Sequence, residues 1–216
     1  MERIVQMHAD FYEKITKDPS ISMELKKENI TILDGFHQNL GLVKKYYETM
    51  YKLQDERIVL CGINPGRNGA GKTGIPFIDF RGASHVLSDV FNDDWERSAQ
   101  FILSIIKEVG IEDFHKRVYM TNLSWFGFKK DGKKLNYYKL PHHLANAFTE
   151  SFINEMDIVN PKVIIPLSKE VEKTLEHMVR TKKLNYPVAP RLPHPYYCSI
   201  GENTGKYKKE YLNAII

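Results

Sequence analysis

The chain has little cysteine and little net charge, and each limits the kinds of site or partner that the protein can have. Its only cysteines are Cys61 and Cys198, too few for a four-cysteine iron–sulfur cluster or a cysteine-rich zinc site. They are far apart in sequence, so we expect reduced thiols, as in a cytosolic protein. Lys plus Arg number 31 against 27 Asp plus Glu, a formal net charge of +4. This balance permits an anionic partner without requiring one.

Long apolar runs are also missing. The first residues, MERIVQMHADFYEKITK, carry charges at Glu2 and Arg3 and contain no apolar stretch of signal-peptide length. No later segment approaches the roughly 18 apolar residues of a membrane span. The chain also has no internal repeat and no low-complexity segment. We therefore expect a cytoplasmic protein with no membrane partner.

What the chain does have is a regular alternation of helical and strand patterns. Apolar spacing predicts helices at residues 4–15, 42–53, 95–109, 141–159, 168–178 (capped by Ser168) and 205–215, and strands at 58–63, 117–121, 162–166 and 186–191. Strands separated by helices imply a mainly parallel sheet covered on both faces. We predict a single α/β domain with three layers, α/β/α, and a central four-stranded mainly parallel sheet. A helical segment of about residues 1–53 would precede an α/β core of about 54–216.

Polar residues follow three of the predicted strands. Asn64 and Asn122 come directly after the first two, and His194 follows the last. Ligands of such sheets bind beyond the carboxyl ends of the strands. We therefore expect these three side chains to meet at one edge of the sheet.

The glycine-rich loop after the first strand, residues 66–82, contains an apparent phosphate-binding motif. Gly66–Thr73 reads GRNGAGKT, two glycines four residues apart followed by Lys and Thr. Such a loop binds phosphate when a helix begins at its Lys-Thr end, but Gly74 and Pro76 stand where that helix would start. Neither RVYMT nor KVIIP ends in the acidic residue that would hold magnesium. A nucleoside triphosphatase is therefore the least favoured interpretation.

Longer matches around the same loop carry a resemblance to a known family. They comprise GINPG at residues 62–66, TGIPF at 73–77, Asn122 in VYMTNLSWF, LPHP at 192–195, and Asn203 with Gly205. From about Tyr46 to the C-terminus the chain resembles the single-strand-selective monofunctional uracil-DNA glycosylases, the SMUG-like branch of the uracil-DNA glycosylase superfamily. The resemblance implies a parallel four-stranded sheet between helices, with DNA as the partner.

The activity that this resemblance implies is hydrolysis of the N-glycosidic bond of uracil or a related damaged base, with neither metal nor cofactor. Phe77 would stack on a flipped-out base, and Asn122 would bind its edge. His194 would stabilise the departing base and Asn64 would hold the attacking water. The remaining wall of the base pocket would come from Ile63, Pro65 and Gly66. Each residue alone has a structural alternative, as a turn, cap or core residue.

One departure from the family pattern concerns the loop that wedges into the DNA stack. The family carries Arg four residues beyond the His, where this chain has Cys198 preceded by Tyr196 and Tyr197. The two tyrosines either replace the wedge by stacking on bases or pack under the loop. Arg67 and Asn68 also replace more apolar residues of the family.

Several lysines are candidates for contacts with DNA phosphates. They lie in two clusters, Lys129, Lys130, Lys133 and Lys134, and Lys206, Lys208 and Lys209. The alternative is a solvated charged surface.

The motifs contain no amine nucleophile, so we expect hydrolysis without a lyase step. The amine of Lys72, which lies close in sequence, leaves that step open. We expect a monomer that is nucleoid-associated if bacterial, and a damaged-DNA-binding module without catalysis is the second interpretation.

Overall fold

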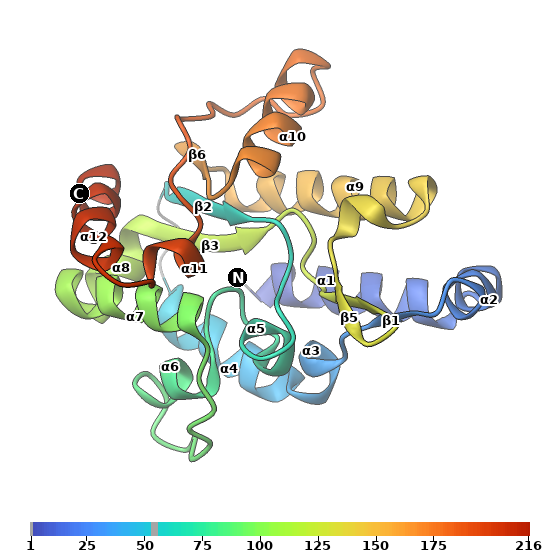
Figure 1. Cartoon of the computed structure of the whole chain (residues 1–216), viewed down its shortest axis with the longest axis horizontal. Coiled ribbons are helices and arrows are strands. Elements are labelled where there is room, and N and C mark those ends of the chain that lie inside the picture. Colours follow the sequence, from blue (N-terminus) through green and yellow to red (C-terminus); the bar gives the residue numbers. More distant parts are fainter. Residues whose placement is uncertain (1, 53–55) are drawn as a thin grey trace.

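A three-stranded parallel sheet forms the centre of the protein (Figure 1). The computed structural model describes residues 2–52 and 56–216. In the sheet, β2 (Ile58–Gly62) lies between β3 (Val118–Asn122) and β6 (Val163–Pro166). Its strands are almost continuously buried, as expected for a parallel sheet covered on both faces.

The prediction of a fourth full strand at residues 186–191 is wrong. This segment makes a single parallel bridge, between Val188 and Ile164. Ile164 donates to the Pro187 carbonyl at 2.9 Å and accepts from Ala189 at 2.9 Å. Pro187, and Pro166 of β6, lack the N–H groups that would extend this bridge in either direction, and the next bond to β6, from Leu192 N to the Pro166 carbonyl at 2.9 Å, does not continue a regular ladder.

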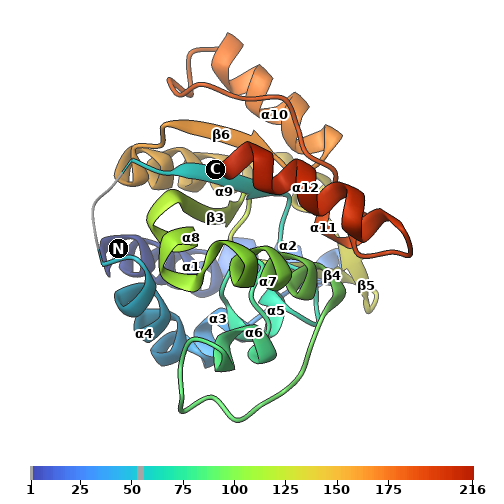
Figure 2. The ribbon, with the colours of Figure 1, turned by 90° about the vertical axis from the view of Figure 1, so that its left-hand side faces the viewer.

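Helices cover both faces of the sheet, which confirms the three-layer α/β/α class. In Figures 1 and 2, α1, α4 and α9 lie on one side and α7 and α12 on the other. Their bounds are α1 (Glu2–Lys17), α4 (Leu40–Met50), α7 (Arg97–Val109), α9 (His142–Val159) and α12 (Asn203–Ile215), with α2 (Pro19–Lys27), α3 (Gly35–Gln38), α8 (Ile111–Arg117) and α10 (Lys169–Arg180) beside them. None of the helices in the described part of the chain has the length and apolarity of a membrane span.

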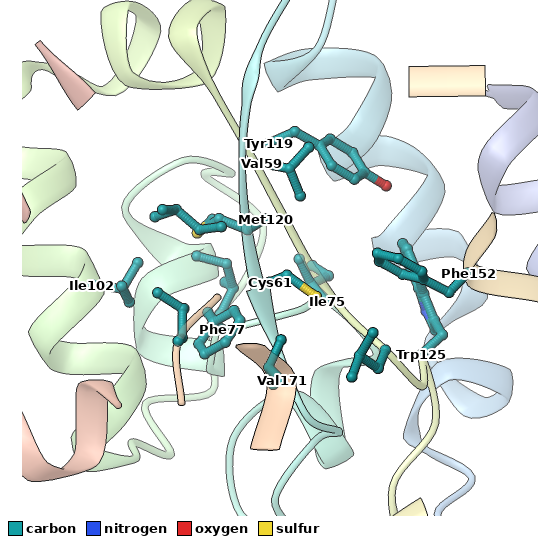
Figure 3. Packing of buried hydrophobic residues seen from close by; sticks show 14 of the residues in the cluster. Val59, Cys61, Ile75, Phe77, Ile102, Tyr119, Met120, Trp125, Phe152 and Val171 are labelled. Atoms are coloured by element: carbon teal, nitrogen blue, oxygen red, sulfur yellow. The ribbon is translucent and has the colours of Figure 1, made fainter. Parts of the chain in front are cut away.

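The two faces of the sheet bury different side chains (Figure 3). Met120 points toward Ile102 of α7, and the neighbouring Tyr119 points to the opposite side, toward Phe152 and Trp125. This alternation follows from the two-residue period of a strand. The core therefore continues from one helical layer through the sheet to the other.

Local signals placed most helix ends correctly. Ser168 caps α10 as predicted, its Oγ accepting from Val171 N at 3.3 Å. Helix α7 begins at Arg97, so the prediction that Trp95 starts it is wrong, because Glu96 is its N-cap and Trp95 precedes it. Leu53, predicted to end the second helix, lies outside the described residues.

A small antiparallel sheet was not predicted from sequence. It joins β1 (Ile30–Ile32) to the hairpin of β4 (Phe128–Lys130) and β5 (Lys133–Leu135). The first 53 residues are therefore not purely helical. The hairpin turn is Asp131-Gly132, with φ values of 51° and 73°, as a two-residue type I′ turn requires. The Asp-Gly signal lay within the lysine cluster, which was interpreted only as a charge run.

Candidate functional site

A cavity of about 120 Å³ lies at the carboxyl ends of the parallel strands. The loop after β2, the last residue of β3 and the segment before α11 (Pro195–Cys198) all contribute to it. The predicted residues that line it are Asn64, Pro65, Gly66, Phe77, Asn122, His194 and Tyr196. Ile63 is not among the lining residues, but its carbonyl accepts from Ser124 N at 3.0 Å. That bond ties the loop after β2 to the loop after β3.

The loop after β2 contains more helix than the sequence indicated. Residues 66–82, predicted as an irregular loop, contain α5 (Ala70–Thr73) and the start of α6 (Phe80–Ser84). The Thr73 hydroxyl donates to the Ile78 carbonyl at 2.6 Å and accepts from Ile75 N at 3.1 Å. These two bonds close the turn that carries Phe77.

Phe77 itself has a left-handed backbone, with φ of 60°. Such a conformation in a bulky residue costs about 1–3 kcal/mol and persists only when the surroundings impose it. The side chain is buried and lines the cavity. The surrounding turn imposes this strained conformation and so keeps an aromatic ring in the cavity wall.

The apparent phosphate-binding motif instead forms part of the loop that leads to Phe77. Helix α5 ends at Thr73 and is followed by left-handed Gly74, so no helix begins at the Lys-Thr end. The ammonium of Lys72 pairs with Asp94. Gly71 hydrogen-bonds the Gly66 carbonyl at 2.9 Å, an approach so close that a Cβ there would lie 2.2 Å from that oxygen. The glycines let the loop fold onto itself.

Gly62, the last residue of β2, allows two cavity residues to approach each other. A Cβ on Gly62 would lie 2.3 Å from Asn122 Oδ1 and 2.6 Å from Phe77 Cζ. Only glycine leaves this space. No hydrogen bond within the described part of the chain engages the Asn122 side chain, so its amide is available to a ligand in the cavity.

The Asn64 amide is held in one orientation by a segment far away in sequence. Its Oδ1 accepts from Tyr137 N at 3.1 Å, and its Nδ2 donates to the carbonyls of Pro65 at 3.1 Å and Leu135 at 3.4 Å. One backbone donor and two backbone acceptors thus distinguish the oxygen from the nitrogen. A second lone pair of Oδ1 remains for a ligand.

His194 presents a neutral ring with a defined tautomer. Its Nδ1 accepts from Tyr196 N at 3.1 Å, so the proton of the neutral ring is on Nε2. Burial, together with the smaller effect of the nearby Lys134 charge, lowers the pKa of His194 to about 4. At neutral pH the side chain is therefore an Nε2–H donor without charge.

Helix α12 fixes the backbone before His194. The Tyr211 hydroxyl donates to the Pro193 carbonyl at 2.6 Å, and the Cys198 thiol contacts the same oxygen at 3.5 Å. Cys198 is fully buried. It packs under the loop where the family places a wedging Arg, so no wedge projects from this position.

Two charged residues of the cavity were not predicted to lie there: Glu96 was missed, and Lys134 was named only as a candidate phosphate contact. Glu96 caps α7 through Ala99 N at 3.1 Å and also accepts from the Ser98 hydroxyl at 3.0 Å. Lys134 comes from β5, whose pairing with β4 was not predicted. Desolvation of its ammonium lowers the Lys134 pKa, and the Glu96 carboxylate opposes this shift. Gly69, Ala70, Ser98 and Ala99 complete the missed lining.

Tyr196 and Lys134 line the cavity, and the other predicted DNA-contacting residues lie outside it. Tyr196 and Tyr197 are each 51 % exposed, and the Tyr197 ring lies 5.6 Å from Tyr207. Lys206 places its ammonium 4.9 Å from the centre of the Tyr207 ring. Lys129 and Lys130 lie in β4.

Two of the predicted lysines already have partners. Lys130 pairs with Glu28 at 2.9 Å and Lys208 pairs with Glu108, which reduces the charge available for a phosphate.

The sheet thus carries, at its strand ends, a cavity with two amides, an aromatic ring and a neutral histidine, and comparison with known proteins identifies the class of protein as a DNA glycosylase of the uracil type. The chain belongs to the uracil-DNA glycosylase superfamily, whose family model, "Uracil DNA glycosylase superfamily", matches residues 49–216. Among solved structures it is similar to wild-type SMUG2 of Pedobacter heparinus, with a TM-score of 0.73 and 26 % sequence identity over 86 % of this chain and 87 % of that chain. The chain is thus a SMUG-like member of the superfamily. Among curated proteins no match was found.

Proposed function

We propose that the protein hydrolyses the N-glycosidic bond of uracil, or of a related damaged base, in DNA, and that it does so without a lyase step. The base would be flipped out of the strand into the cavity at the strand ends. The observation that carries this proposal is the meeting of Asn64, Phe77, Asn122 and His194 around one cavity.

Phe77 and Asn122 recognise the base. The strained turn presents the Phe77 ring as a stacking surface. The Asn122 amide accepts the ring N–H of uracil through its oxygen and donates to the adjacent carbonyl through its nitrogen. Gly62 supports this pair because it lets Asn122 approach the Phe77 ring.

His194 stabilises the leaving base. Breaking the glycosidic bond develops negative charge on the pyrimidine ring, and a donor already in place lowers that barrier. The Nε2–H of His194 donates to the carbonyl that Asn122 does not bind. Because the ring is neutral, it supplies a hydrogen bond and gives up no proton at this step.

Asn64 positions the attacking water. An amide does not act as a base near neutral pH, so the water adds to a sugar that already carries positive charge. The free lone pair of Asn64 Oδ1 accepts a hydrogen bond from this water. Its bonds to Leu135 and Tyr137 keep the oxygen fixed.

The test is base excision from oligonucleotides that contain one uracil, in single-stranded and duplex form. Abasic sites are detected as strand breaks after alkali treatment. Wild-type protein should produce them, and strand breaks without alkali should be absent. Asn64→Ala should lower the rate at least about 100-fold, by analogy with the loss of one preorganised polar group.

Two further variants keep this test decisive. Asn64→Ala also removes bonds to the Leu135–Tyr137 backbone, so its thermal unfolding is measured alongside. Asn122→Ala leaves no protein group unpaired and should also lose excision, whereas the exposed Asn213→Ala should retain it. Tight binding of uracil-DNA without cleavage by wild-type protein would support a binding module instead.

The two exposed tyrosines are proposed to act on duplex DNA. They occupy the loop from which the family's wedge projects, and aromatic rings stack on exposed bases. Replacing both Tyr196 and Tyr197 with Ala should lower duplex excision more than single-strand excision, with little change in melting temperature. An unchanged duplex rate would assign the tyrosines to packing.

A further inference from the structure

A second hollow lies beside the base cavity, on another side of the first turns of α7. It has a volume of about 340 Å³. We call it the flanking groove; its lining includes Trp95, Arg97, Gln100, Ser104, Ser199 and Thr204. None of these residues belongs to the base cavity.

The base cavity and the flanking groove share their walls. Helix α7 and its cap give Glu96 and Ser98 to the base cavity, and Arg97 to the flanking groove. The α11 segment gives Tyr196 to the base cavity, and Ser199, directly after α11, to the flanking groove. Figures 1 and 2 show α7 and α11 side by side. A strand whose base enters the cavity would therefore pass next to this groove.

The groove offers an aromatic surface to solvent. Trp95 is 52 % exposed although it is a large apolar residue, and nucleobases stack on such rings with about 1–3 kcal/mol per base. Phe91, in the same loop, is 90 % exposed but lines a different hollow beside α4. Trp95 is thus the aromatic residue of this loop that faces the shared wall.

The charges around Trp95 favour an anionic strand. Three acidic residues surround it in sequence, and each has a partner: Asp93 pairs with Arg81, Asp94 pairs with Lys72, and Glu96 caps α7. Within residues 2–52 and 56–216, no ion pair involves Arg97. The Arg97 guanidinium can therefore bind a phosphate.

We propose that the flanking groove binds the nucleotide next to the flipped base, with its base stacked on Trp95 and its phosphate paired with Arg97. This inference rests on the proposed function, because it takes the neighbouring cavity to hold the flipped base. It adds a specific contact to a flanking nucleotide.

The composition of the chain supplies a direct readout. It has two tryptophans, and Trp125 is only 4 % exposed. In Trp125→Phe, tryptophan emission, excited at a wavelength that tyrosine does not absorb, comes from Trp95 alone. A short single-stranded oligonucleotide that carries a stable abasic analogue is titrated in, and stacking should quench this emission in a saturable way. If Trp125→Phe folds poorly, the difference in quenching between wild type and Trp95→Phe isolates the same signal.

Affinity measurements supply the second readout. Trp95→Ala should raise the Kd for this oligonucleotide about 30-fold, which corresponds to the middle of the stacking range. Arg97→Gln should reduce the slope of log affinity against log salt by about 0.7. Phe91→Ala is the matched control and should bind as wild type does.

The outcomes separate this inference from the proposed function. Saturable binding with unchanged Trp95 emission, or wild-type affinity in Trp95→Ala, would overturn the flanking groove even if uracil excision is normal. Quenching with a weakened Trp95→Ala would support it. If that quenching occurs in a protein that excises no base, the proposed function fails while the groove stands as a nucleic-acid site.

Discussion

Two histidines in different regions of the molecule, one buried and one half-buried, differ in whether a ring N–H remains for a ligand. His115, at the contact between α4 and α8, and His194, in the cavity, both have pKa values lowered to about 4, chiefly by burial. In His115 both ring nitrogens have partners, Tyr46 Oη at 2.7 Å and the Ile111 carbonyl at 2.6 Å. In His194 only Nδ1 has a partner among residues 2–52 and 56–216. Burial fixes the neutral state in both, but only the histidine with a remaining N–H can bind a ligand.

The largest effect should follow from removing that remaining N–H. His194→Asn keeps an acceptor for Tyr196 N, since Asn is a good N-cap, but it loses the donor at Nε2. Uracil excision should fall about 100- to 1,000-fold with little change in stability. The exposed His177→Asn is the control. A rate within a few-fold of wild type would place the leaving-group donor elsewhere.

The next effect concerns stability as the pH falls. Each unfolded histidine takes up a proton near pH 6.5, whereas folded His115 and His194 do so only near pH 4. Between these values the unfolded chain binds more protons, so the free energy of unfolding falls as the pH falls from 6.5 toward 4. For fully buried His115 the loss is on the order of 3 kcal/mol.

Urea unfolding at pH 7 and pH 4.5 measures this loss. His115→Phe removes the titrating ring, so its stability should depend less on pH than that of wild type, whatever its stability at pH 7. An equal pH dependence in wild type and His115→Phe would contradict the assignment. Uracil excision by folded His115→Phe at pH 7 should persist, because His115 does not line the cavity.

The smallest effect tests the charge beside His194. Lys134→Gln removes the positive charge that lowers the His194 pKa, so this pKa should rise. It should stay below 6.5, because burial is the larger cause. Histidine NMR titration measures the change. Lys133→Gln is the control, since neighbouring strand residues point to opposite faces, and an equal shift in that variant would assign the effect to general charge.

Much of the fold could be predicted from local patterns. The buried runs of β2, β3 and β6 and the cap at Ser168 each depend on a few neighbouring residues. Two failures came from local signals that were given too little weight. The segment around Val188 has a strand-like composition, but Pro187 and, in β6, Pro166 limit it to one bridge. The Asp-Gly turn between β4 and β5 was present in the sequence and was overlooked beside the lysines.

The candidate site also contains residues that could be predicted from the sequence and residues that could not. Asn64, Asn122 and His194 could be predicted because parallel strands end at one edge of a sheet. Lys134 and Glu96 could not, because the first needs the hairpin to fold against Asn64 and the second needs Asp79 to hold the start of α7, through Glu96 N at 2.8 Å. Nothing local marks either residue as part of a cavity.

The sequence by itself determined the scarcity of thiols, the order of strands and helices, and the polar residue after each strand, since these depend on composition and short-range periodicity. Only the tertiary structure decided that His194 is neutral with its proton on Nε2, that Asn64 has one orientation, and that Cys198 points inward. Those properties depend on burial and on hydrogen bonds between segments far apart in the chain. They exist only once the chain has packed around the cavity.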